Sequence, residues 1–190
     1  MSDDDITETV LTGDAYERAA VTTRRMIGLS LVEKVRMAIV FLAVSTTLAP
    51  MVSYRRELIR TVEGTETVAP AFALLALNGL VVTFVGGVVL VRQSRVRPQD
   101  ESHARKLIRI EDFLAVLVIS GGLFILTAVT LAVVGLVSPG TVETLAESGV
   151  RLYRPAGTAV ADSRLVSGVG GLLALALFVL WRTLGRTAHL

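Results

Sequence analysis

Residues Phe113–Val137 read FLAVLVISGGLFILTAVTLAVVGLV and contain no charged side chain. An α-helix rises about 1.5 Å per residue, so roughly 20 apolar residues suffice to cross the ~30 Å hydrocarbon core of a bilayer. Similar uncharged stretches occupy Met37–Ser53, Val68–Val91 and Leu165–Trp181. The sequence therefore predicts an all-α fold, a four-helix transmembrane bundle embedded in the lipid bilayer.

The composition fits a single membrane domain. Of the 190 residues, 52% are hydrophobic, and the mean hydropathy is +0.64. We expect a cytoplasmic N-terminal segment over residues 1–36, the membrane domain over 37–181 and a cytoplasmic tail over 182–190. The chain has no cysteine, which excludes disulfides and thiolate metal sites, and its net charge of +2 does not favour a nucleic-acid partner. Its 17 Arg and 2 Lys indicate a GC-rich prokaryotic genome.

The basic residues predict the orientation. The N-terminal flank, the connection between spans two and three and the C-terminal tail hold 13 Lys and Arg, whereas the other two connections hold 6. Because Lys and Arg concentrate in cytoplasmic loops, both termini should face the cytoplasm of a plasma membrane. The first five residues are polar and acidic, unlike a signal peptide, so the first span is expected to remain as an anchor.

The sequence of the N-terminal segment predicts an amphipathic helix that begins after an N-cap at Asp14. Such a helix would lie at the membrane interface with its arginines near anionic head groups, and a solvated lead-in helix is the alternative. For the basic residues before span three, setting the topology is the main interpretation and lipid binding the alternative. The side chains expected near head groups are Arg18, Arg24, Arg25, Arg105, Lys106 and Arg109.

Local signals place the start and the interruption of the first helix. Ser30 and Glu33 match a capping box, so a helix should begin there and continue into span one. Lys34 and Arg36 should snorkel to the interface. Pro50 should kink or end the helix, because proline lacks the N–H of the helix ladder.

Two further boundaries can be predicted. A helix should begin near Asp100–Ser102 and continue into span three, with Glu101 and Arg105 in a favourable i, i+4 order. The loop 138–164 should hold a short amphipathic helix over Thr141–Ser148 and a turn at Arg154–Gly157.

Small residues recur every four positions within the spans. Such spacing forms a groove that lets another helix approach closely. We interpret the pattern as packing within one bundle, and an interface between subunits is the alternative. The residues are Gly79, Thr83 and Gly87 in span two and Ser167, Gly170, Gly171 and Ala174 in span four.

A thin polar layer is expected at mid-membrane. Asn78 is the only strongly polar side chain in any span. An amide in hydrocarbon seeks a hydrogen-bond partner, so bonding between helices that fixes their register is the main interpretation. A polar constriction in a conduction path is the alternative. The layer comprises Ser45, Thr46, Asn78 and Thr127.

Residues that carry enzyme chemistry are missing from the sequence. Neither H-E-x-x-H nor G-x-S-x-G occurs, and His103 and His189 lie outside the spans, so we expect no catalytic residue, metal or cofactor. Glu111 and Asp112 are adjacent at the start of span three, but helix neighbours do not face each other, which disfavours a metal site. We therefore expect a non-enzymatic protein that works through helix–helix association, as a homo-oligomer or an accessory subunit of a second membrane protein. The alternative is an oligomeric passive channel or pore for ions or small solutes.

Overall fold

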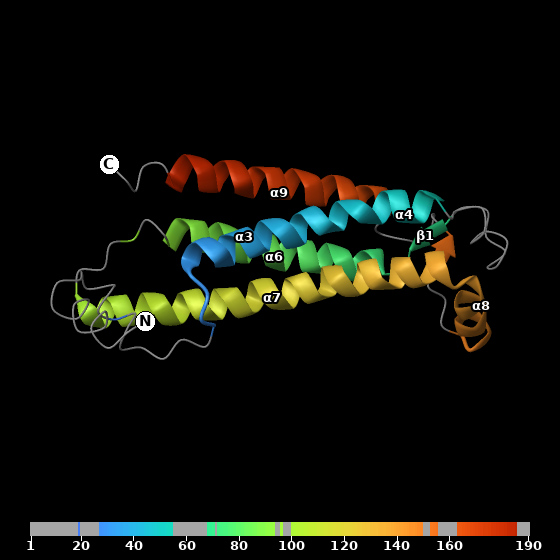
Figure 1. Cartoon of the computed structure of the whole chain (residues 1–190), viewed down its shortest axis with the longest axis horizontal. Helices are drawn as coiled ribbons and strands as arrows, with labels where there is room; N and C mark the ends of the chain where they lie inside the picture. The colour runs from blue at the N-terminus through green and yellow to red at the C-terminus, as the bar shows by residue number, and fades with distance from the viewer. Residues whose placement is uncertain are drawn as a thin grey trace.

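The structure is a computed structural model that describes residues 19, 27–54, 68–70, 72–93, 96, 100–149, 153–155 and 163–185. Four of the described helices are long and apolar enough to cross a membrane, and they lie side by side as a bundle (Figure 1), which confirms the predicted fold class. The predicted interfacial helix, with Arg18, Arg24 and Arg25, lies outside the described residues except for Ala19. Ala19 is buried against Ala104 and Ile108.

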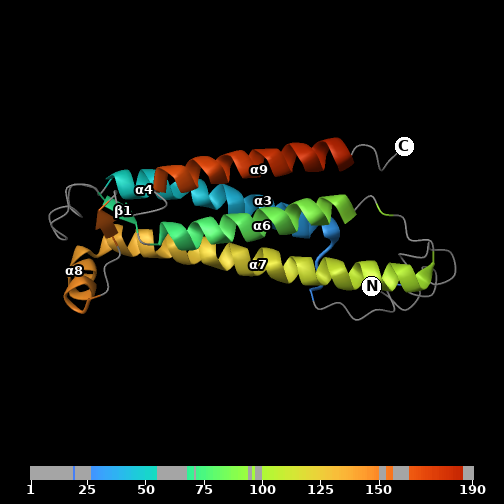
Figure 2. The same cartoon turned by 180° about the vertical axis from the view of Figure 1, so that it is seen from behind.

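The helices alternate in direction. The first span consists of α3 (Leu31–Val44), a 3₁₀ turn (Ser45–Thr47) and α4 (Leu48–Tyr54). The later spans are α6 (Ala73–Gln93), α7 (Glu101–Val137) and α9 (Ser163–Gly185), and the short helix α8 (Pro139–Glu147) follows α7. Two short strands, β1 (Val68–Pro70) and β2 (Tyr153–Pro155), precede α6 and α9. The start of α3 and the ends of α6 and α9 lie together, and α8 lies at the opposite end, as the reverse view also shows (Figure 2). We call these the Lys34 end and the α8 end.

The first span begins where its sequence predicts, and its α-helix is interrupted shortly before Pro50. The Ser30 hydroxyl accepts the Glu33 N–H at 3.3 Å, and the Glu33 carboxylate accepts the Ser30 N–H at 2.7 Å, which completes the capping box. The interruption by Pro50 takes the form of the 3₁₀ turn just before it. There the hydroxyls of Ser45, Thr46 and Thr47 each donate to the carbonyl three residues earlier, at 2.6–2.7 Å.

The second span begins later than predicted. Residues Val68–Pro70 form β1, and α6 starts only at Ala73, because Pro70 lacks a helix donor and disfavours helix in the residue before it. β1 pairs antiparallel with β2, so that Val68 lies opposite Pro155 and Pro70 opposite Tyr153. The region predicted as a turn at Arg154–Gly157 therefore begins as a strand. This pairing joins the two connections at the α8 end.

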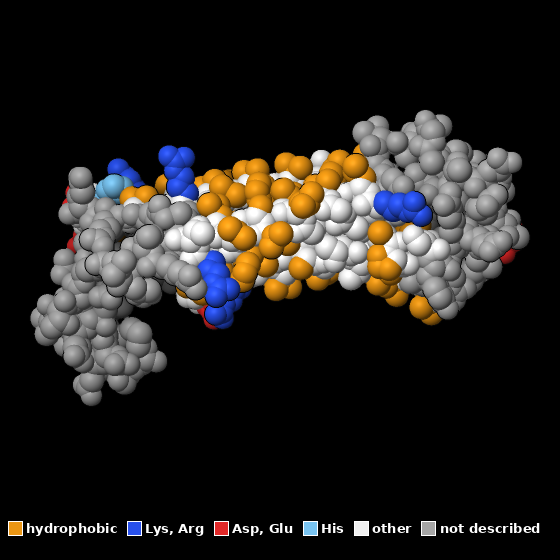
Figure 3. Space-filling view, turned by 90° about the horizontal axis from the view of Figure 1, so that it is seen from above, with side chains coloured by type: hydrophobic (Ala, Val, Ile, Leu, Met, Phe, Trp, Pro, Cys, Tyr) orange, Lys and Arg blue, Asp and Glu red, His pale blue; other side chains and the backbone are white. Residues whose placement is uncertain are grey.

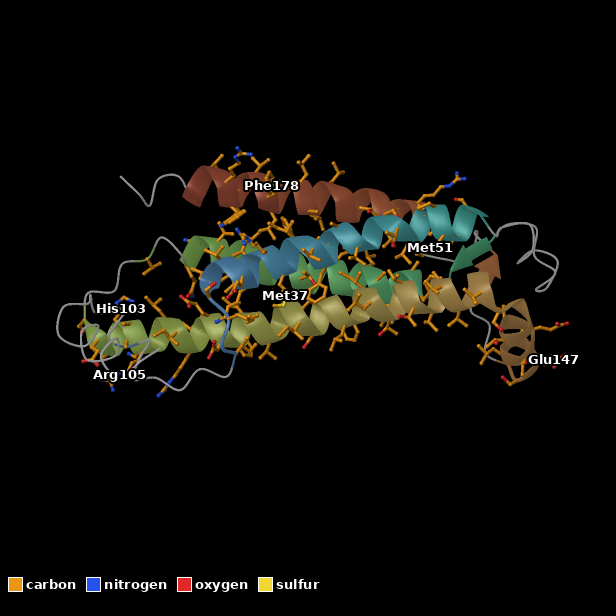
Figure 4. The ribbon with its side chains drawn as sticks, in the orientation of Figure 1. Met37, Met51, His103, Arg105, Glu147 and Phe178 are labelled. Atoms are coloured by element: carbon orange, nitrogen blue, oxygen red, sulfur yellow. The ribbon has the colours of Figure 1, made fainter. Side chains whose placement is uncertain are left out.

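The third span is the longest helix. Asp100 caps α7, as predicted, by accepting the His103 N–H at 2.7 Å, and Arg105 contacts Glu101 at 3.2 Å. The 37 residues of α7 reach about 55 Å, well beyond the ~30 Å of a hydrocarbon core. Its first turns project past the other helices at the Lys34 end, where His103 and Arg105 lie (Figure 4).

The predicted short helix after span three is α8. It packs on the end of the bundle through Val142, which is buried in the main core, and Leu145, which packs against that core. Along the bundle, the outward face is apolar and the Lys and Arg side chains lie toward the two ends (Figure 3). Outward-facing apolar side chains include Val40, Val81, Val85, Leu123, Leu172 and Leu175. This distribution fits a bundle whose middle is surrounded by lipid.

Candidate functional site

A buried ion pair joins the first span to the third at the Lys34 end. The Nζ atom of Lys34, in the first turn of α3, donates to Oδ1 of Asp112 in α7 at 2.8 Å. Lys34 is 1% exposed and Asp112 is 4% exposed. The expectation that Lys34 snorkels to the interface is therefore wrong, because its side chain turns into the bundle.

Helix periodicity explains this inward direction. The capping box fixes the start of α3, and Lys34 then precedes Ala38 and Leu42 by one and two turns on the buried face. Glu33 and Arg36 fall on the exposed face. The prediction begins span one at Met37, after the charged Arg36, and so leaves Lys34 outside the span. The period of Ala38 and Leu42, extended back by one turn, places Lys34 on the same buried face.

Glu111 is buried beside Asp112, so two consecutive carboxylates enter the Lys34 end from α7. Adjacent helix positions point in different directions, and only Asp112 reaches Lys34. Among the described residues, no group of three His, Cys, Asp or Glu side chains is placed to hold a metal ion. The ion pair of Lys34 and Asp112 holds α3 against α7, since a charge in an apolar interior is stable only when paired.

Arg36 makes a second contact near this end. Its guanidinium carbon lies 5.8 Å from the ring centroid of Trp181 in α9, within the range of a cation–π interaction. Phe178 lies 6.3 Å from the Trp181 ring. The first turns of α3 are thus bound to α7 through Lys34 and to α9 through Arg36.

The projecting part of α7 carries three exposed basic side chains, Arg105, Lys106 and Arg109, which we call the basic stripe. Lys106 and Arg109 are exposed on one side, and Ile110 and Phe113 continue that side toward the middle of the bundle. Arg105 lies beside them, paired with Glu101. The change from apolar to basic side chains within two turns is typical of a membrane boundary.

The small residues of span two meet other helices of the same chain. A Cβ atom built on Gly79 would lie 2.5 Å from the Gly121 carbonyl oxygen, and one on Gly121 would lie 2.5 Å from Thr83 Oγ1. A Cβ atom on Gly87 would lie 2.6 Å from the Leu177 side chain. The α6 groove is therefore filled by α7 and α9, so that it offers no free surface to a second subunit.

In span four, the Ser167 hydroxyl bridges two backbone groups at the interruption in the helix of span one. Its hydroxyl accepts the Ala49 N–H at 2.8 Å and donates to the Ser45 carbonyl at 3.1 Å. These two groups are four residues apart, so the hydroxyl takes the place of one bond of the helix ladder. Gly170 allows this approach, because a Cβ atom there would collide with Ser45 Oγ.

The other two small residues of α9 differ from each other in their surroundings. A Cβ atom on Gly171 would make an ordinary contact of 3.4 Å with Thr46 Cγ2. Ala174 is buried in the main core.

The four side chains of the expected polar layer are not brought together within one chain. Ser45 is buried, whereas Thr46, Asn78 and Thr127 are exposed on the outside of the bundle. Asn78 Nδ2 donates to the Leu74 carbonyl at 3.0 Å, one turn earlier in the same helix. Asn78 makes no other hydrogen bond to the described residues, so the rest of its amide faces the surroundings of the bundle.

Comparison of the chain with protein-family models, with curated proteins and with solved structures finds no match. The function of the chain is therefore inferred from the arrangement of its described side chains.

Proposed function

We propose that this chain is a non-enzymatic integral membrane protein that works through association of its transmembrane helices, as a homo-oligomer or as an accessory subunit of another membrane protein. The observation that supports this proposal is Asn78, an amide on the lipid-facing side of α6. Hydrocarbon offers no hydrogen-bond partner, whereas a second transmembrane helix does. Hydrogen bonds between helices in a membrane contribute about 0.6–2 kcal/mol each, enough to bias association.

The proposed setting is a plasma membrane with the Lys34 end in the cytoplasm. The basic stripe of Arg105, Lys106 and Arg109 supports this orientation, because basic side chains at a membrane boundary favour the cytoplasmic side and its anionic lipids.

The test is the mass of the complex extracted gently from its native membrane, measured by native mass spectrometry. We expect a discrete species heavier than one 20.3 kDa chain, made of further copies or of a stoichiometric second protein. A protein that is monomeric both after extraction and after crosslinking in the membrane would overturn the proposal.

A passive pore between copies is the second candidate. It is favoured by the position of Asn78 and Thr127, which face outward from the adjacent helices α6 and α7 and could line a path shared by several copies. Liposomes containing the protein should then conduct ions or small solutes, and Asn78→Leu should change the flux. A protein without flux, or an unchanged flux in Asn78→Leu, would remove this candidate.

A further inference from the structure

Two outward faces of the bundle have the same geometry. On α6 the exposed residues Leu74, Asn78, Val81 and Val85 follow one another at spacings of four, three and four residues, and on α9 Gly168, Leu172, Leu175 and Val179 do the same. Each set therefore forms one stripe of its helix. The two helices run in the same direction (Figure 1). A polar side chain stands at one position of the two stripes, where α6 has the amide of Asn78 and α9 has Leu172.

The exposure of apolar side chains favours the α9 face over the α6 face. Val81 and Val85 are 54% and 55% exposed, and Leu172 and Leu175 are 70% and 60% exposed. If apolar exposure alone selected an interface, α9 would be the better surface. In a bilayer, however, lipid tails solvate apolar side chains as well as another helix does. The amide of Asn78 is therefore the group that gains from a protein partner.

The chemistry of the amide selects a second copy of this chain. An amide is both a donor and an acceptor, so it complements itself. Copies inserted in the same orientation present parallel α6 helices, and a two-fold axis along the membrane normal places each interface residue opposite its own counterpart. Asn78 then faces Asn78, and each side chain can donate to the other's carbonyl oxygen. A single asparagine in an apolar helix stripe also fixes the register and the number of chains.

We propose that the stripe of Leu74, Asn78, Val81 and Val85, the Asn78 face, is the interface of a parallel two-fold dimer in the membrane. This inference rests on the proposed function of helix association and specifies its partner and its surface. Val81 and Val85 pack against the same residues of the second copy, and the paired amides of Asn78 lie between Leu74 and Val81 along the stripe.

The chain has no cysteine, so single-cysteine variants report proximity without background. Val81→Cys and Val85→Cys should each form a disulfide-linked dimer when oxidised in native membranes. Leu175→Cys and Val179→Cys occupy the equivalent positions of the α9 stripe and serve as matched controls. They should remain monomeric under the same oxidation.

Substitutions of Asn78 in the Val81→Cys background test the amide itself. Asn78→Leu should raise the dimer dissociation constant roughly 3- to 30-fold for each interhelical bond that is lost. Asn78→Gln keeps an amide and should retain most of the crosslinking. Because Asn78 makes only a local bond within α6, the thermal unfolding of both variants should match that of the parent when all three are monomeric in dilute detergent.

The outcomes separate this inference from the proposed function. Crosslinking through α9 but not α6, or capture of a different protein by Val81→Cys, would overturn the Asn78 face as a dimer interface while leaving helix association intact. A dimer that forms equally well with Asn78→Leu would overturn the role of the amide. A protein that is monomeric in every variant and in the parent would overturn both proposals.

Discussion

Lys34 and Asp112 depend on each other, because a charge buried in an apolar bundle is stable only when paired. Lys34→Met removes the Lys34 ammonium from beside the Asp112 carboxylate and should destabilise the bundle, by no more than about 3–5 kcal/mol. Asp112→Asn should also destabilise, and the double variant should lose less than the sum of the two single losses. Thermal unfolding in detergent measures these differences.

Lys106→Met is the control for this experiment. Lys106 is an exposed lysine on α7, so its loss should change the unfolding free energy by no more than about 0.5 kcal/mol. If Lys34→Met has an effect as small as Lys106→Met, the ion pair contributes nothing to stability.

Single residues also show how far sequence reasoning extends. The capping box of Ser30 and Glu33 could be predicted because it depends on residues three positions apart. The partner of Lys34 could not, because it lies 78 positions away and depends on how α3 and α7 pack. Asn78 could be recognised as polar, but its outward direction becomes clear only when the buried face of α6 is known.

At the level of helices, the backbones of α6 and α7 lie close together at Gly79, Thr83 and Gly121. A Cβ atom on Gly121 would lie 2.8 Å from the Gly79 carbonyl oxygen and 2.9 Å from the Thr83 nitrogen, so backbone atoms would have to move. Gly121→Ala should therefore destabilise the bundle by about 1–3 kcal/mol in detergent unfolding.

Gly168→Ala provides the matched substitution in a helix of the same bundle. A Cβ atom there meets nothing within 4 Å, so the variant should be neutral or slightly stabilised. Equal destabilisation by both substitutions would indicate a general effect of helix composition rather than close packing of α6 on α7.

The start of α7 should depend on pH through Asp100. The His103 backbone N–H, and then the Ser102 hydroxyl, hold the pKa of its carboxyl below the ordinary value of 3.8. A lowered pKa in the folded state means that the cap is fully effective above the unfolded pKa and is lost as the pH falls through the folded one. Amide hydrogen exchange at His103 should stay slow down to about pH 4 and accelerate below it.

Two substitutions check the cap. Asp100→Ala should accelerate exchange at the His103 amide even at neutral pH, because the acceptor is gone. Asp100→Ser keeps an uncharged cap and should show protection that does not change between pH 3 and 6. An Asp100→Ala variant with unchanged exchange would show that the cap does not order the helix start.

All four spans could be predicted from the length of the uncharged apolar stretches, but the residues at which the helices begin and end could not. Span two was predicted from Val68, whereas the pairing of Val68–Pro70 with Tyr153–Pro155 makes that segment a strand. Strand pairing between two distant loops leaves no periodic signal in three residues. The start of α7 was predicted correctly because Asp100 is a local cap.

For the molecule as a whole, the ends of the bundle should lie on opposite sides of the membrane. In the cysteine-free background, Arg105→Cys reports on the Lys34 end and Glu147→Cys on α8, at the other end (Figure 4). A membrane-impermeant maleimide applied to intact cells should label only Glu147→Cys, and cell lysis should expose Arg105→Cys. Labelling of Arg105→Cys in intact cells would reverse the orientation.

The proposed orientation would place the basic stripe of α7 beside cytoplasmic head groups. Replacing Arg105, Lys106 and Arg109 with glutamine should reduce the anionic phospholipid that copurifies with the protein, measured by lipid mass spectrometry. Arg164→Gln changes an exposed arginine at the α8 end and should leave the bound lipid unchanged. Equal loss in both variants would indicate nonspecific charge attraction.

The strand pair at the α8 end also sets an order of events during biosynthesis. β1 is synthesised before α6, and β2 only after α7 and α8. Pro70 therefore cannot pair until the ribosome has added the residues up to its partner, Tyr153. At a translation rate of about 5–20 residues per second this delay lasts roughly 4–17 s. The α8 end therefore closes only after α8 has been made, and a ribosome that stalls after α7 leaves β1 without its partner strand.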